Sequence, residues 1–400
     1  METFLGIVVG LFVLMFLVTA HEFGHFIMAR RNGVKVLEFG ICFPPRAIAW
    51  VKDKKTGKWT KINRKDWNKP QDGLVFSLNW LPIGGFCQMD GESATDDRKG
   101  TFGNASFKSK TKILFGGVAV NWLIAIIIFT VLAWTGMPTF VDNQFTIDSD
   151  TTLVTKPISI VEVVEDSPAA KAGLIAGDQI ISVDEQILVS TNDISDYNAA
   201  HAGEDVTYFI RHQDDTENNY NIRLNPADSE FLLGITMKSD QILSYSTWSA
   251  PIVGVGVTAQ LTGETFRGVG IMLWNIVSGT FSQFSTDTTV RENGQAALAA
   301  AGDSVSGPIG IIGIIFPSFT ASGLTNLAFL TALISVSLAC MNVLPIPALD
   351  GGRWLLIAIY KLRGKKLDKS IEEKIVARAF VILLALIAAV TILDITRFFR

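Results

Sequence analysis

The pentapeptide His21-Glu22-Phe23-Gly24-His25 stands at the end of an apolar run of membrane length. Residues 4–20 contain no charge, and residues 26–29 extend the apolar stretch. Positions i and i+4 lie on one side of an α-helix, so both imidazoles point the same way. The His-Glu-x-x-His pattern on a helix is typical of zinc sites in which the two histidines bind the metal and the glutamate is the general base. Two alternatives are a chance motif on a solvated helix and a His–Glu pair satisfied by neighbouring helices.

The surroundings of the pentapeptide favour the functional interpretation. The chain has 4 histidines, and two of them lie in this one apolar stretch. Ionisable side chains inside a membrane helix are costly unless a partner compensates them, and they usually mark functional sites. A divalent ion facing the interior of a helix bundle would compensate His21, His25 and Glu22 together.

Composition and charge spacing indicate a membrane protein. Hydrophobic residues make up 48% of the 400 residues, charged residues 18%, and the mean hydropathy is +0.34. These values exclude an ordinary soluble protein. The dispersed basic residues show no nucleic-acid-binding pattern and fit topology and anionic headgroups better. We predict four crossings from the uncharged runs, which are 4–20, 113–137, part of 304–349, and 379–393 extended past a snorkelling Arg378.

The distribution of charge predicts the orientation. Residues 30–112 contain 17 Lys and Arg against 8 Asp and Glu, whereas residues 140–245 contain 5 against 19. By the positive-inside rule the first segment is cytoplasmic and the second lies outside. Residues 268–286 are also uncharged, but a crossing there would place the basic residues after Leu349 on the wrong side. We therefore expect 248–286 and 306–318 to be interfacial.

The cytoplasmic segment contains a second apolar feature. Residues 73–80 and 81–89 are strand-like and meet around Pro82 and Gly84-Gly85, which predicts a β-hairpin. Such a hairpin between two crossings would dip into the bilayer, and the alternative is a solvent loop with its own small core.

The outer segment predicts a small α+β domain. A strand at 158–164 is followed by a short helix that begins at Pro168 and ends at Gly173, then by a Gly-Asp turn and a second strand. The string SPAAKAGLIAGDQIISV (167–183) resembles bacterial PDZ domains. By that resemblance Leu233-Gly234-Ile235 belong to the peptide-binding loop, which is displaced as in circularly permuted members. Such domains bind an extended peptide at a sheet edge. A steric filter over the membrane site is the equal alternative.

A catalytic zinc takes three protein ligands and water, so a carboxylate must join the two histidines. The candidate is Asp350 in the string NVLPIPALDGG (342–352). Pro345 and Pro347 break the helix, and irregular backbone at membrane depth occurs only where it lines a cavity. Alone, Asp-Gly-Gly would be a common turn, but the predicted topology brings it to the same leaflet side as His21 and His25.

HEFGH, an outer PDZ domain and NVLPIPALDGG together resemble the site-2 protease family of intramembrane zinc metalloproteases, bacterial regulator-of-sigma-factor type (the RseP and RasP kind). The resemblance covers essentially the whole chain. Two departures are a single PDZ domain instead of a tandem pair, and Val118 in GVAVN (117–121) where the family usually has proline. The resemblance implies roles for the following residues. Zinc ligands are His21, His25 and Asp350, the base is Glu22, and the substrate-binding residues are Asn342, Pro345 and Pro347 with Gly84, Gly85 and Phe86 of a re-entrant β-loop.

The expected fold is a polytopic α-helical membrane protein with about four transmembrane helices, a membrane-associated β-hairpin and an extracytoplasmic α+β PDZ domain. The expected segments are helix 1 with HEFGH (1–30), the cytoplasmic loop and hairpin (31–112), helix 2 (113–137), the PDZ domain (140–240), interfacial segments (241–322), helix 3 with LDGG (324–352), a cytoplasmic loop (353–374) and helix 4 (375–396).

The expected activity is Zn²⁺-dependent hydrolysis of a peptide bond within or near the membrane segment of single-pass proteins, as in regulated intramembrane proteolysis. Expected substrates are anti-sigma factors or signal-peptide remnants, with an upstream protease making a first cut. The expected location is a bacterial cell membrane, with the site toward the cytoplasm and the PDZ domain outside. Two other functions stay open, an inactive membrane scaffold and a metal transporter.

Overall fold

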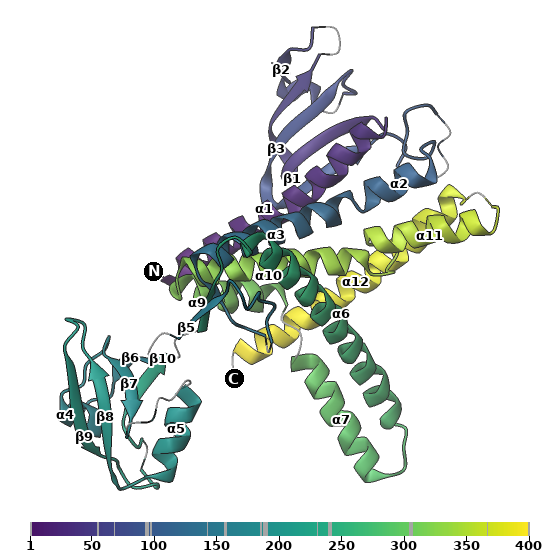
Figure 1. Ribbon diagram of the computed structural model, residues 1–400. Coiled ribbons are helices and arrows are strands. Elements are labelled where there is room, and N and C mark those ends of the chain that lie inside the picture. The colour runs from purple at the N-terminus through teal and green to yellow at the C-terminus, as the bar shows by residue number, and fades with distance from the viewer. Residues whose placement is uncertain are drawn as a thin grey trace. The chain divides into compact units, whose positions relative to one another are not determined.

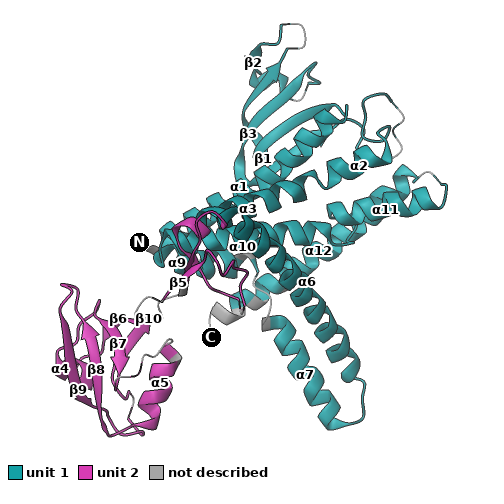
Figure 2. Ribbon diagram, in the orientation of Figure 1, with its two compact units in different colours: residues 1–132, 250–400 teal, residues 133–249 magenta. Residues whose placement is uncertain are grey.

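Figure 1 shows the computed structural model of the chain. Secondary structure is described for residues 2–398 except 54–55, 68, 93–95, 97, 142, 156–157, 185, 187–190, 230, 239–241, 304–306 and 366. The chain forms two compact units (Figure 2). Unit 1 comprises Met1–Leu132 with Ala250–Arg400, and unit 2 comprises Ala133–Ser249.

Four helices in the described part of the chain are long and apolar enough to cross a bilayer. They are α1 (Glu2–Arg31), α3 (Gly116–Thr135), α10 (Leu324–Val343) and α12 (Lys369–Phe398). A helix of 20 residues spans about 30 Å, the thickness of the hydrocarbon core. The prediction of four apolar helices is therefore confirmed.

A short amphipathic helix, α2 (Phe107–Leu114), precedes α3. Ser106 caps it, because its hydroxyl accepts the backbone N–H of Ser109 at 3.1 Å. Its buried side chains Ile113 and Leu114 join a core with Phe26 of α1. Phe115 separates α2 from α3, with φ and ψ angles of −87° and 1° that lie outside the helical region.

The strands of unit 1 form an antiparallel sheet of β1 (Val36–Lys52), β2 (Trp59–Lys61) and β3 (Leu74–Met89), with a short 3-10 helix, η1 (Arg64–Asp66), between β2 and β3. The first half of β1 pairs with residues 85–89 on one side and with residues 75–78 on the other. The predicted hairpin of 73–80 with 81–89 is therefore wrong, since the two halves of β3 lie on opposite sides of β1.

Both long strands bend at the same end of the sheet. Cys42 in β1 and Gly84 in β3 have φ angles of 65° and 90°, which lie in the left-handed region. Phe43 and Leu81 are register partners there. Both are exposed, as are Trp80 and Ile83, so this end of the sheet is an apolar tip.

After unit 2 the chain returns through a helical segment with five elements. They are α6 (Ala250–Ser282), α7 (Thr288–Asp303), α8 (Pro308–Gly310), the π-helix η2 (Ile311–Ile315) and α9 (Phe316–Ala321). The helices α6 and α7 run side by side as a hairpin (Figure 1). Although α6 is 33 residues long, it is not among the four span candidates. α9 packs on the first half of α1, where Gly10 makes room for the ring of Phe316.

The helix α12 is tied to this segment by a buried carboxylate. Asp394 accepts backbone N–H groups of Gly307 at 3.2 Å and of Gly310 at 2.8 Å. These are free N–H groups at the start of a helix, which a carboxylate satisfies well.

Unit 2 contains a five-stranded antiparallel sheet in the order β10-β6-β7-β8-β9, two helices and a smaller three-stranded sheet. The larger sheet consists of β6 (Ile158–Val163), β7 (Gln179–Val183), β8 (Asp205–Arg211), β9 (Glu217–Arg223) and β10 (Ile235–Lys238). The helices are α4 (Pro168–Ala172) and α5 (Thr191–Ala200), and the smaller sheet consists of β4 (Met137–Pro138), β5 (Thr152–Thr155) and β11 (Ile242–Tyr245).

The predicted order of strand, short helix, strand, helix and further strands is present in unit 2. Ser167 caps α4, Pro168 is its first residue, and Gly173 ends it with a φ of 87°. Apolar side chains from the sheet and from α5 form one core, in which Tyr208 and Ile194 are fully buried.

Candidate metal centre and active site

Three potential metal-binding atoms from α1 and from α11 (Asp350–Leu362) lie within van der Waals distance of one another. Nε2 of His21 and Nε2 of His25 are 3.1 Å apart. Oδ2 of Asp350 lies 3.0 Å from the first nitrogen and 3.3 Å from the second. Both histidines are only 6% exposed. The structure thus brings together the three residues that sequence analysis predicted as ligands, from positions far apart in the chain.

This triangle has the size that zinc requires. Zinc binds histidine nitrogen and carboxylate oxygen at about 2.0–2.1 Å, and a tetrahedral arrangement then separates neighbouring ligand atoms by about 3.3–3.4 Å. The observed separations of 3.0–3.3 Å are close to this value. Two imidazoles and one carboxylate also leave a fourth position for water, as in catalytic zinc sites.

Asp350 is placed by the end of α10 and by the two prolines that follow this helix. α10 ends at Val343, and Asp350 is the first residue of the separate helix α11. The following glycines let the two helices approach. A Cβ on Gly351 would lie 2.0 Å from the carbonyl oxygen of Val343, and one on Gly352 would lie 2.0 Å from that of Ile346. Both glycines of the Asp-Gly-Gly string are therefore required for packing.

Glu22 lies beside the triangle without belonging to it. One carboxylate oxygen and one nitrogen of each histidine lie within 4.8 Å of one another. The backbone amide of Cys87 in β3 is close enough to interact with this side chain. The Glu22 side chain thus lies beside the two imidazoles.

A backbone carbonyl fixes the orientation of the second imidazole. Nδ1 of His25 donates a hydrogen bond to the carbonyl oxygen of Ile113 at 2.8 Å. Because Nδ1 then carries the proton, Nε2 presents its lone pair to the triangle. Ile113 lies in the last turn of α2.

The centre opens into a cavity of about 240 Å³. It is lined by all three residues of the triangle, by Glu22 and by Asn342 of α10. One amide hydrogen of Asn342 bonds to the carbonyl oxygen of Leu338 at 2.9 Å, and the other has no partner among the residues that the structure describes.

The other residues predicted to bind substrate lie outside this cavity. Gly84 and Gly85 pack on α1, where added Cβ atoms would lie 2.5 Å from Val18 and 3.1 Å from Thr19. The ring of Phe86 covers Gly40 of β1. Pro345 is in the irregular segment after α10, and Pro347 lines a second cavity.

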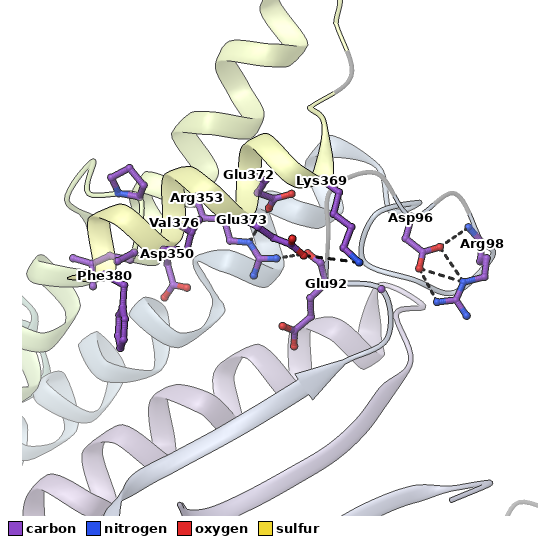
Figure 3. A pocket seen from close by; sticks show the side chains of 15 residues that line it. Glu92, Asp96, Arg98, Asp350, Arg353, Lys369, Glu372, Glu373, Val376 and Phe380 are labelled. Atoms are coloured by element: carbon purple, nitrogen blue, oxygen red, sulfur yellow. Dashed lines mark hydrogen bonds and ion pairs between the residues drawn. The ribbon is translucent and has the colours of Figure 1, made fainter. Parts of the chain in front are cut away.

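That second cavity, of about 1030 Å³, leads from Asp350 to a charged mouth (Figure 3). Arg353 lies 3.5 Å from Glu372 of α12 and also donates to the carbonyl oxygen of Glu92. Charged side chains thus line the cavity that also contains Asp350.

In unit 2, the predicted peptide-binding loop precedes the edge strand β10. The side chain of Leu233 lies in the core and is 3% exposed. Gly234 has a φ of 78°, and a Cβ there would lie 2.2 Å from that of Ser167. Ile235 pairs with Val163 of β6, and the other side of β10 has no strand partner among the described residues.

Sequence analysis missed the groups that support the centre from α2, α3 and β3. The carbonyl of Ile113 and the N–H of Cys87 are backbone groups, so no side-chain pattern signals them. Gly117 and Asn121 in α3 also surround His21, because a Cβ on Gly117 would lie 2.6 Å from its ring. The signal that could have found them is their i, i+4 spacing in a predicted span.

A buried His-Glu-x-x-His helix with a further carboxylate beside both imidazoles has the residue set of a metallopeptidase centre. The sequence matches the model of peptidase family M50 over residues 9–387. The chain belongs to this family, the site-2 protease family of zinc metalloproteases. The predictions of the family, of a metalloprotease and of zinc as its cofactor are therefore confirmed.

Two relatives and two solved structures are similar to this chain or to part of it. A "Putative zinc metalloprotease" of Clostridium acetobutylicum is 26% identical, covering 98% of each chain, and one of Clostridium perfringens is 28% identical, covering 97% of this chain and 98% of the relative. The PDZ domain of an SdrC-like protein of Listeria innocua is 28% identical over 20% of this chain and 93% of that chain, with a TM-score of 0.19. Its counterpart of Listeria monocytogenes is 30% identical over 21% and 90%, with the same TM-score.

Proposed function

We propose that this chain is an intramembrane endopeptidase that hydrolyses a peptide bond within or near the transmembrane segment of single-pass membrane proteins. One observation carries the proposal. His21, Glu22 and His25 lie on α1, which has the length and hydropathy of a membrane span, and Asp350 meets them from the segment that follows α10, another such helix. Anti-sigma factors and signal-peptide remnants are the substrate types that we propose.

Each residue of the centre has a distinct role in this reaction. His21, His25 and Asp350 hold the zinc ion, which when bound lowers the pKa of water toward about 7 and polarises the substrate carbonyl. Glu22 takes the proton of the attacking water and returns it to the leaving amine.

The size of the cavity requires an unwound substrate. An α-helix with its side chains is about 10 Å wide, which a cavity of 240 Å³ cannot hold. We propose that the free amide hydrogen of Asn342 binds the substrate carbonyl near the metal. The irregular segment with Pro345 and Pro347 offers further backbone groups to an extended chain.

The edge of the sheet next to α1 would stabilise the extended substrate. Among the described strands, residues 85–89 pair with β1 alone; Gly85 and Phe86 belong to this part of β3, and Gly84 directly precedes it. An extended peptide could add there as a further strand. The exposed apolar tip of the same sheet supports its insertion into the bilayer.

The proposed topology follows from the charges. The basic segment 30–112 would lie in the cytoplasm and unit 2 outside a bacterial cell membrane. Unit 2 would then control access, either by binding a peptide at β10 or by rejecting bulky ectodomains. Either role links this reaction to an earlier cut by an upstream protease.

The decisive experiment uses the full chain in liposomes with a single-pass reporter protein. We expect the wild type to cleave the reporter, Glu22→Gln to retain zinc without cleaving, and His25→Ala to lose both. Cleavage by Glu22→Gln would contradict the assigned base. Zinc binding without any turnover by the wild type would favour a scaffold, and zinc flux into the liposomes would favour a transporter.

A further inference from the structure

The helix α3 forms a cradle for the first imidazole of the centre. Gly117 lies against the ring of His21, where a Cβ would come within 2.6 Å of Nε2. One helical turn further along α3, Nδ2 of Asn121 lies 3.4 Å from Nδ1 of the same ring. Gly117 thus leaves space for the ring of His21, and the amide of Asn121 lies next to Nδ1, the second nitrogen of that ring.

The amide of Asn121 is completely buried, and only one of its two polar atoms has a hydrogen-bond partner among the described residues. The residue is 0% exposed and lines the 240 Å³ cavity. Its Oδ1 has no hydrogen-bond partner within the described part of the chain. A buried amide oxygen without a donor is unfavourable, so a partner for it is expected in the working protein.

We propose that Asn121 is a positioning residue that accepts a hydrogen bond from Nδ1–H of His21 and thereby aims Nε2 at the metal. This inference rests on the proposed role of His21 as a ligand. A neutral histidine that binds metal through Nε2 carries its proton on Nδ1. A half-turn of the Asn121 amide, which exchanges two atoms of similar size, brings Oδ1 to that proton.

Both imidazoles are then held by the same stretch of chain. The carbonyl of Ile113 accepts from His25, and in the proposed orientation of its amide Asn121 accepts from His21. The hydroxyl of Ser335 in α10 donates to the backbone carbonyl of Asn121 at 2.8 Å, which anchors this part of α3 to the helix that leads to Asp350. Outer partners of metal-binding histidines typically raise metal affinity by about 10–100-fold.

The test compares zinc affinity among variants of the full chain purified in detergent, measured by competition with a chromophoric chelator. Asn121→Leu keeps the approximate volume and removes the acceptor. Asn121→Asp keeps an acceptor. Asn326→Leu is the matched control, because Asn326 is also a buried asparagine with an unpartnered Oδ1, but it lies near the start of α10.

We expect Asn121→Leu to weaken zinc binding about 10–100-fold, with Asn121→Asp close to wild type and Asn326→Leu unchanged. The visible spectrum of Co²⁺ bound in place of zinc should change in Asn121→Leu and return in Asn121→Asp. Unchanged affinity in Asn121→Leu, or equal losses in Asn121→Leu and Asn121→Asp, would overturn the inference. His21→Ala distinguishes a failure of this inference from a failure of the ligand assignment. Zinc retained in His21→Ala would contradict the assignment of His21 as a ligand.

Discussion

Gly24 of α1 and Gly116 of α3 lie in backbone contact. A Cβ on Gly24 would come within 2.3 Å of the carbonyl oxygen of Gly116, and one on Gly116 within 2.7 Å of that of Gly24. Small residues allow helices to approach in this way inside membranes. On α1 this contact falls between His21 and His25. It therefore holds the neighbouring chain close to both imidazoles, with Gly117 beside the ring of His21 and Ile113 beside the ring of His25. The fourth residue of HEFGH therefore has a structural role that the zinc pattern does not require.

The first prediction concerns this contact. Gly24→Ala should push α1 away from α3, destabilise the protein by about 1–3 kcal/mol and weaken zinc binding. Gly270→Ala is the control, since Gly270 lies in α6 with no atom within 4 Å of an added Cβ. It should be neutral or slightly stabilising. Thermal unfolding and zinc titration in detergent measure both effects, and equal behaviour of the two variants would contradict the contact.

The second prediction concerns metal removal. Zinc stabilises the folded chain by its binding free energy, about 2.7 kcal/mol when free zinc is 100 times its Kd. A chelator should therefore lower the melting temperature of the wild type. Asp350→Asn, which loses the anionic ligand, should melt at one temperature with or without chelator. A chelator shift as large as that of the wild type would argue against Asp350 as a ligand.

The third prediction concerns the loop before β10. Gly234→Ala should destabilise unit 2, because it combines a φ of 78° with a Cβ 2.2 Å from that of Ser167. Gly203→Ala is the matched control, with a φ of 82° and open space around it. We expect about 1 kcal/mol for the control, the cost of left-handed backbone alone, and more for Gly234→Ala. Limited proteolysis of unit 2 would compare the two variants. Similar protease sensitivity would mean that the loop shifts to accommodate the added Cβ at Gly234, which would contradict the prediction.

The fourth prediction concerns acid stability. Partial desolvation opposes ionisation of Asp150, but hydrogen bonds from Ser249 and Thr247 outweigh it and lower the pKa from 3.8 to about 2. A lowered pKa in the folded state stabilises the protein above the unfolded pKa, and this contribution is lost as the pH falls from about 4 to about 2.

The variant Asp150→Asn cannot titrate and isolates this effect. It should be less stable than the wild type at neutral pH, and the difference should vanish near pH 2. The fluorescence of Trp134 reports on the region, because its indole N–H donates to the carbonyl of Thr247 at 2.7 Å. A stability difference that does not change with pH would show that the Asp150 carboxylate does not titrate in this range.

Local patterns predicted much of the fold and centre. Long apolar runs located the four candidate spans, and the SPAAKAG string located a capped helix between two strands in unit 2. In contrast, the pairing in β3 was not predictable. Residues 73–80 and 81–89 have the local pattern of a hairpin, but β1 inserts between them. Strand pattern specifies which residues can form strands and leaves open which strands pair.

The sequence by itself determined the chemistry of the centre, because two histidines four residues apart share a helix face wherever that helix lies, and a carboxylate in a proline-broken span suggested a third ligand. The tertiary structure alone decided that the three atoms meet within 3.3 Å and which groups hold them. These groups are backbone atoms and an asparagine from other elements. Their positions depend on how closely helices pack, which no local pattern of residues records.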